Sequence, residues 1–188
     1  MSRMSGTASI AEVRSTQRSA GRASAVAPGV RAFLAVAALG AGLLHAALAP
    51  GAPPVLLGLL IAIAAAELGW AAVALASDRP PLFAVVPVLA LLPVAVWAAL
   101  AVVGATASSG SVLVLPLAPM AVASLLDLAV AGTSAVVIRR DRPAPQDTGA
   151  LRFVIALALS AAAVCAITIP ALGLTESGVA AVTVHHHH

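Results

Sequence analysis

Five apolar stretches, each long enough to cross a lipid bilayer, alternate along this 188-residue chain with short segments that carry most of its charges. A helix rises about 1.5 Å per residue, so roughly 20 apolar residues cross a hydrocarbon core about 30 Å thick. Unpaired backbone polar groups are costly in lipid, and an isolated apolar stretch avoids them by forming a helix. The sequence therefore predicts an all-α transmembrane bundle with five spans. The expected spans are residues 32–49, 54–76, 82–103, 112–138 and 151–172.

The composition argues against a water-soluble fold. Hydrophobic residues make up 61% of the chain and charged residues only 9%, whereas soluble domains have about 25% charged residues. The net charge of +3 does not indicate a nucleic-acid partner, because aromatic residues are only 3% and the basic residues are dispersed. The expected partner is the lipid bilayer, with a second membrane protein or another copy of the chain as further candidates.

All ten basic residues are arginines, and their positions predict the orientation of the chain. They fall before the first span, between the second and third spans, and between the fourth span and the first residues of the fifth. Short arginine-rich segments stay on the cytoplasmic side during insertion. We therefore expect a multi-pass protein of the cytoplasmic membrane, with the N-terminus inside and the C-terminus outside. The arginines are Arg3, Arg14, Arg18, Arg22, Arg31, Arg79, Arg139, Arg140, Arg142 and Arg152.

The spans divide the chain into three parts. Residues 1–30 are basic and lack sustained apolar periodicity, so we expect a disordered cytoplasmic tail. Residues 31–173 form the predicted five-helix transmembrane domain. Residues 174–188 form an external C-terminal tail that ends in four histidines, either native or added as a purification tag. These histidines are His185, His186, His187 and His188.

Prolines punctuate the predicted spans. The Pro-rich residues 50–54 predict a tight external turn, which makes the first two spans an antiparallel pair. Pro93 in the third span and Pro119 in the fourth predict kinks that free backbone carbonyls. Such kinks either open a small cavity or are tolerated without one. A re-entrant start of the fourth span is the main alternative to five crossings.

Three ionisable side chains lie inside the apolar stretches: His45, Glu67 and Asp127. A charge at the bilayer centre costs about 2.5–3.5 kcal/mol on insertion scales, so such residues usually face the protein interior. Counting residues from the outer ends of the spans places His45 roughly 6 Å deep and both carboxyls about 21–23 Å deep. We therefore expect two polar layers. The two carboxyls either form a pair that binds a cation or relays a proton, or hydrogen-bond locally.

A second group of side chains predicts a soft-metal site. The same counting places Met120 and Cys165 about 12 Å and 10 Å below the outer surface, near His45. Thioether, thiolate and imidazole ligands suit copper(I), and the terminal histidines suit copper or zinc. Ordinary packing of Met120 and Cys165 is the alternative interpretation.

The nine residues Gly42–Pro50, which include His45, precede a Pro-rich turn and a second span with Glu67 and Trp70. This segment resembles small multi-pass membrane proteins of unknown role in high-GC Gram-positive bacteria, some of which also end in a short external tail containing histidine. The resemblance covers the first two spans and the tail, and it implies no specific function. This chain has no further histidine in the loop after Pro50, which weakens a metal role carried over from the resemblance.

No phosphate-binding loop, HExxH motif, nucleophile elbow or cysteine pair is present in the sequence, so we expect no enzymatic activity. Three hypotheses follow. The first is a structural or accessory membrane protein in which the buried polar residues stabilise helix contacts. The second is transition-metal handling through the terminal histidines and His45. The third is proton- or cation-coupled transport through Glu67 and Asp127.

Overall fold

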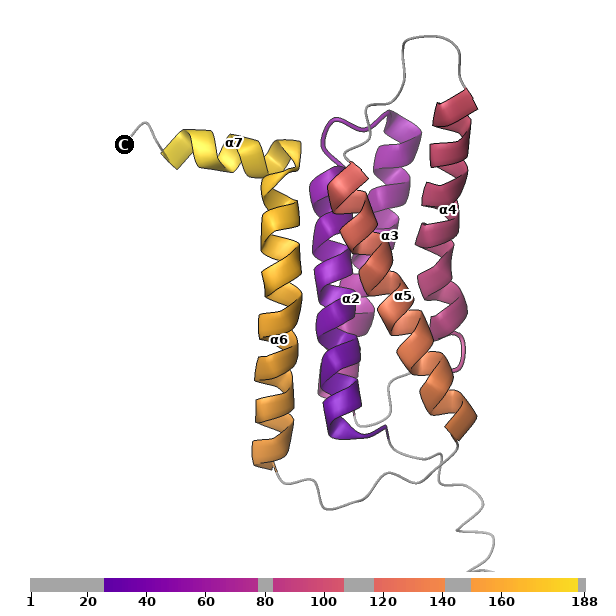
Figure 1. Ribbon diagram of the computed structural model, residues 1–188, viewed down its shortest axis with the longest axis vertical. Helices are drawn as coiled ribbons and strands as arrows, with labels where there is room; N and C mark the ends of the chain where they lie inside the picture. The colour runs from indigo at the N-terminus through magenta and orange to yellow at the C-terminus, as the bar shows by residue number, and fades with distance from the viewer. Residues whose placement is uncertain (1–25, 78–82, 107–116, 141–149, 186–188) are drawn as a thin grey trace, which may run out of the picture.

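The computed structural model describes residues 26–77, 83–106, 117–140 and 150–185, and the regular structure of these residues is entirely helical. Five long helices run lengthwise beside one another, and a shorter one, α7, lies across the end of α6 (Figure 1). The helices are α2 (Pro28–Leu48), α3 (Pro54–Ala76), α4 (Val86–Thr106), α5 (Leu117–Arg140), α6 (Ala150–Gly173) and α7 (Glu176–His185).

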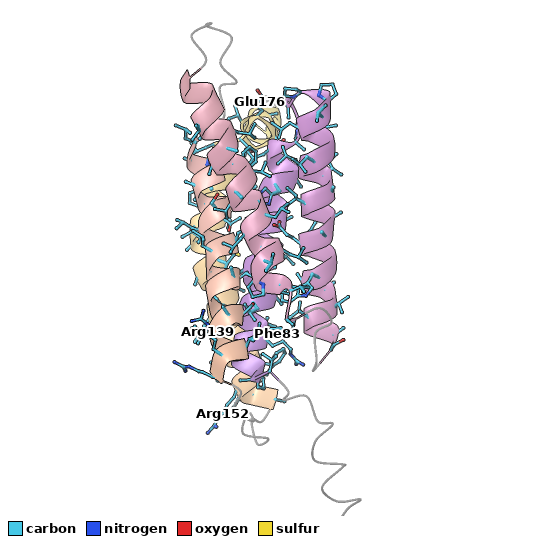
Figure 2. All side chains as sticks on the ribbon, turned by 90° about the vertical axis from the view of Figure 1, so that its right-hand side faces the viewer. Phe83, Arg139, Arg152 and Glu176 are labelled. Atoms are coloured by element: carbon cyan, nitrogen blue, oxygen red, sulfur yellow. The ribbon has the colours of Figure 1, made fainter. Side chains whose placement is uncertain are left out.

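Four of the described helices, α2, α3, α5 and α6, are long and apolar enough to cross a membrane. The apolar part of α4, Val86–Val102, is shorter. Arg139 and Arg152 lie at one end of the bundle and Glu176 lies at the other (Figure 2). These arginines and the start of α7 therefore lie at opposite ends of the bundle.

Several helix boundaries differ from the predicted spans. The first helix begins at Pro28, inside the segment predicted to be disordered, because proline suits the first turn of a helix. Helix α4 begins four residues after the predicted position 82, and α5 begins at Leu117. Part of the region predicted as a C-terminal tail forms α7. Residues 1–25, 112–116 and 186–188 lie outside the described residues.

Helix α2 is the centre of the bundle, packed against α3, α5 and α6, while α4 packs against α5. This central position depends on small residues, which let helix backbones approach closely. A Cβ atom added at Gly40 would lie 2.6 Å from Val164 Cγ1 and 3.1 Å from Leu126 Cδ1. Glycine at position 40 therefore allows α5 and α6 to pack directly on α2.

The connection between α2 and α3 determines the relative height of these helices. Leu48, the last residue of α2, shares a buried cluster with Leu60, which lies six residues after the start of α3. Six helical residues rise about 9 Å. The connection therefore climbs past the end of α2, with Gly51 at a φ of 84°, and α3 begins above it (Figure 1).

Candidate functional site

Four helices each contribute one polar side chain to the same place inside the bundle: His45 from α2, Glu67 from α3, Trp97 from α4 and Asp127 from α5. One ligand atom from each of the three ionisable residues lies within 4.8 Å of the others. His45 is 0% exposed and Asp127 is 2% exposed. Glu67, at 15%, is slightly more accessible. The three ionisable groups therefore form one buried cluster.

Both ring nitrogens of His45 have hydrogen-bond partners. His45 Nδ1 lies 2.9 Å from Glu67 Oε2, and Trp97 Nε1 donates to His45 Nε2 across 3.3 Å. An indole N–H can only donate, so Nε2 carries the lone pair. The proton of the imidazole is therefore on Nδ1, which donates to Glu67. Trp97 thus selects the tautomer that turns an N–H of His45 toward the carboxyl of Glu67.

Each of the two carboxyls has an oxygen without a hydrogen-bond partner among the described residues. These atoms, Glu67 Oε1 and Asp127 Oδ2, are both buried. Two carboxylates this close in a poorly hydrated site repel each other strongly, so they require a proton or a cation between them. The two carboxylates therefore need a shared proton or a bound cation to be stable in this cluster.

A cavity of about 420 Å³ adjoins the carboxyls. Its lining includes Glu67 and Asp127, and nearly all of the other lining side chains are apolar. Pro93, which lies inside α4 and lines the cavity, has no N–H for the carbonyl of Leu89, four residues earlier. The structure thus has a cavity beside one of the predicted proline kinks. Other lining residues are Ala38, Ile63, Ala66, Leu92 and Val130.

The structure corrects the predicted separation into two polar layers. His45 was expected far above Glu67, but the two side chains are in hydrogen-bond contact. The prediction is wrong because it counted the depths of His45 and Glu67 from one common level at the turn between the two helices. In the structure α3 begins above the end of α2, so Glu67 lies closer to the level of His45 than the count gave. Whether Glu67 and Asp127 form a pair or hydrogen-bond locally was left open by the sequence; in the structure their ligand atoms lie within 4.8 Å of one another.

The residues of the predicted soft-metal site lie in different environments. Met120 is buried in the cluster that contains Leu48, Leu60 and Trp97. Cys165 is exposed on α6, and it does not belong to the group of ligand atoms formed by His45, Glu67 and Asp127 in the described part of the chain.

The terminal histidines add no described ligand atoms to the site. His185 ends α7 and its side chain lies outside what the structure describes, as do His186, His187 and His188. Among the described residues, the group of metal-ligating atoms that lie within 4.8 Å of one another is therefore that of His45, Glu67 and Asp127.

Sequence reasoning missed Trp97. Trp97 was recognisable in principle, because its indole N–H lies in the middle of a predicted apolar span and a buried N–H donor needs a hydrogen-bond acceptor. His45, one of few polar side chains in the spans, was the natural candidate.

Comparisons with protein families, with curated proteins and with solved structures give no match to this chain.

Proposed function

We propose that this chain is an integral protein of the cytoplasmic membrane that exchanges protons for a cation at the cluster of His45, Glu67 and Asp127. It would act as a proton-coupled carrier with five spans, a cytoplasmic N-terminus and an external C-terminus. The arginine distribution supports this orientation, and the four helices long enough to cross a membrane support the location.

The observation that carries the proposal is the convergence of three ionisable side chains from three helices within 4.8 Å. Ionisable groups in the membrane interior are costly and commonly mark proton or ion pathways. Glu67 and Asp127 can share one proton, and a cation that reaches them can replace that proton without changing the total charge of the site. Competition between the proton and the cation is the basis of coupled exchange.

The hydrogen bonds of His45 favour proton exchange over a resident transition metal. A metal bound to either ring nitrogen would displace Glu67 or Trp97 from that nitrogen. A proton that moves between the two carboxyls leaves both contacts intact. His45 therefore acts as a positioning residue that orients Glu67.

Metal analysis of purified protein without His185–His188 tests this point. We expect no stoichiometric copper or zinc. Metal that is retained by wild type and lost in His45→Ala would support transition-metal handling instead.

Exchange can be measured in liposomes that hold a pH-sensitive dye and an acidic interior. Sodium, potassium or a lipophilic ammonium is added outside, and each trace is compared with that of protein-free liposomes. Cation entry coupled to proton exit should make the interior more alkaline. The double variant Glu67→Gln, Asp127→Asn should abolish this change in pH. The control variant Ser134→Ala, which replaces a buried polar residue elsewhere on α5, should preserve it. Exchange that continues unchanged in the double variant would refute the proposal.

The orientation has a separate test. A reporter enzyme that is active only outside the cytoplasmic membrane, fused after Val184, should be active. Activity of a reporter that works only in the cytoplasm would instead mean that one predicted span does not cross. The start of the fourth predicted span is the leading candidate for such a re-entrant segment.

A further inference from the structure

We infer that the cavity beside Glu67 and Asp127 binds a lipophilic primary or secondary amine in its protonated form, and that this ammonium enters sideways from the lipid between α3 and α4. The inference deepens the proposed function, on which it rests, because it names the class of cation that competes with the proton.

The two carboxyls define the head group of the ligand. Glu67 and Asp127 both line the cavity, and apart from a proton shared between the two carboxyls, Glu67 Oε1 and Asp127 Oδ2 have no hydrogen-bond partner in the described part of the chain. A primary or secondary ammonium brings at least two N–H donors and one positive charge, so it can satisfy both oxygens and relieve the repulsion between the carboxyls. A quaternary ammonium carries the same charge but has no N–H group.

The walls of the cavity define the body of the ligand. Apart from the two carboxyls, the lining is made of apolar side chains and Trp70. The volume of about 420 Å³ lies in the lower part of the range of roughly 300–1,000 Å³ that small-molecule sites occupy. Small hard metal cations prefer many oxygen ligands, which side chains of this cavity supply only through the carboxyls. A small aromatic or alkyl amine fits both the walls and the acceptors.

The edge of the cavity defines the route of entry. Leu89 and Leu92 on α4 line the cavity and are 54% and 51% exposed, and Ala62 and Ala66 on α3 are also exposed. Helix α3 packs mainly on α2, and α4 mainly on α5. The cavity therefore reaches the apolar outer surface of the bundle between α3 and α4. In a membrane this surface faces lipid, where a lipophilic amine concentrates.

A series of amines with one carbon skeleton tests the head group. The primary, N-methyl, and N,N,N-trimethyl forms of 2-phenylethylamine are titrated by calorimetry into protein in lipid nanodiscs, with empty nanodiscs subtracted. Loss of charge-assisted hydrogen bonds should weaken the trimethyl form by about 10- to 100-fold relative to the primary form. Repeating the titration in buffers of different ionisation enthalpy should show proton release on binding of the primary form. Equal affinities of the primary and trimethyl forms would overturn the inference.

Variants test the place of binding. Asp127→Asn should reduce the affinity for the primary form and abolish its preference over the trimethyl form. Leu89→Trp should obstruct the cavity and weaken binding, while leaving titration of the carboxyls intact. Val88→Trp is the matched control, because Val88 is 70% exposed and does not line the cavity. Binding unaffected by Asp127→Asn and Leu89→Trp would overturn the assigned place.

The inference and the proposed function fail in different ways. Carboxyls that titrate, as followed by infrared spectroscopy, in a protein that binds none of the amines would refute only the amine. Carboxyls that do not titrate would refute proton exchange itself.

Discussion

Replacing Asp127 with Asn is expected to stabilise the fold while it abolishes proton exchange. Asparagine keeps the size of the side chain and removes its charge. Ligand oxygens of Glu67 and Asp127 lie within 4.8 Å, and at an effective dielectric constant of about 20 two full charges at that separation repel by about 3.5 kcal/mol. The asparagine amide can donate an N–H to Glu67 in place of the proton that the two carboxyls share, so the substitution keeps a hydrogen bond between the two side chains.

The stabilising effect of Asp127→Asn should increase as the pH rises. In acidic medium a proton neutralises one carboxyl, and wild type and variant should have similar stability. As the medium becomes alkaline, the folded wild type must either hold a proton that the unfolded chain releases or accept two charges. Its stability therefore falls with rising pH. The advantage of Asp127→Asn should grow to about 3.5 kcal/mol.

Thermal unfolding in a mild detergent, followed by circular dichroism over a series of pH values, measures this difference. Ser134→Ala is the control, because Ser134 lies on the same helix, is buried and has a hydroxyl without a described partner. Its effect should not vary with pH. An Asp127→Asn variant that is less stable than wild type at every pH would show that Asp127 has a structural role, and the repulsion argument would be wrong.

Two further substitutions test the surroundings of the cluster. Trp97→Phe removes the N–H that His45 accepts and should lower the free energy of unfolding by about 1–3 kcal/mol; unchanged thermal stability would contradict this hydrogen bond. Gly40→Ala should cost about 1–3 kcal/mol by overpacking the contact of α2 with α5 and α6. Gly69→Ala, where an added Cβ meets nothing within 4 Å, should cost nothing, and equal melting temperatures of these two alanine variants would argue against the close packing.

The number of apolar residues between charges and prolines predicts individual helices well. Helix α3 (Pro54–Ala76) has the predicted bounds, and α6 (Ala150–Gly173) differs by one residue at each end. Prolines and charged loops delimit these two segments, so local sequence is sufficient there. The start of α2 was missed because Pro28 was treated as part of the tail instead of as a favourable first residue of a helix.

The site could be predicted only in part, because it depends on the relative heights of different helices. The costly residues His45, Glu67 and Asp127 were recognisable as interior groups. The contact between His45 and Glu67 was not recognisable from the sequence. Residues 49–53 place the start of α3 above the end of α2, and this offset changes the depth of Glu67 relative to His45. The contribution of Trp97 and the cavity between α3 and α4 depend on how α4 packs, and apolar pattern alone does not determine this packing.

Infrared difference spectroscopy of the protonated carboxyl groups tests the central claim most directly. Purified protein in lipid is brought from acidic to alkaline medium, and the C=O stretch of carboxylic acids is followed. Proton exchange at the cluster predicts a band from a buried carboxylic acid that disappears in alkaline medium, is removed by the double variant Glu67→Gln, Asp127→Asn, and persists in Ser134→Ala. A wild-type spectrum identical to that of the double variant at every pH would contradict the claim.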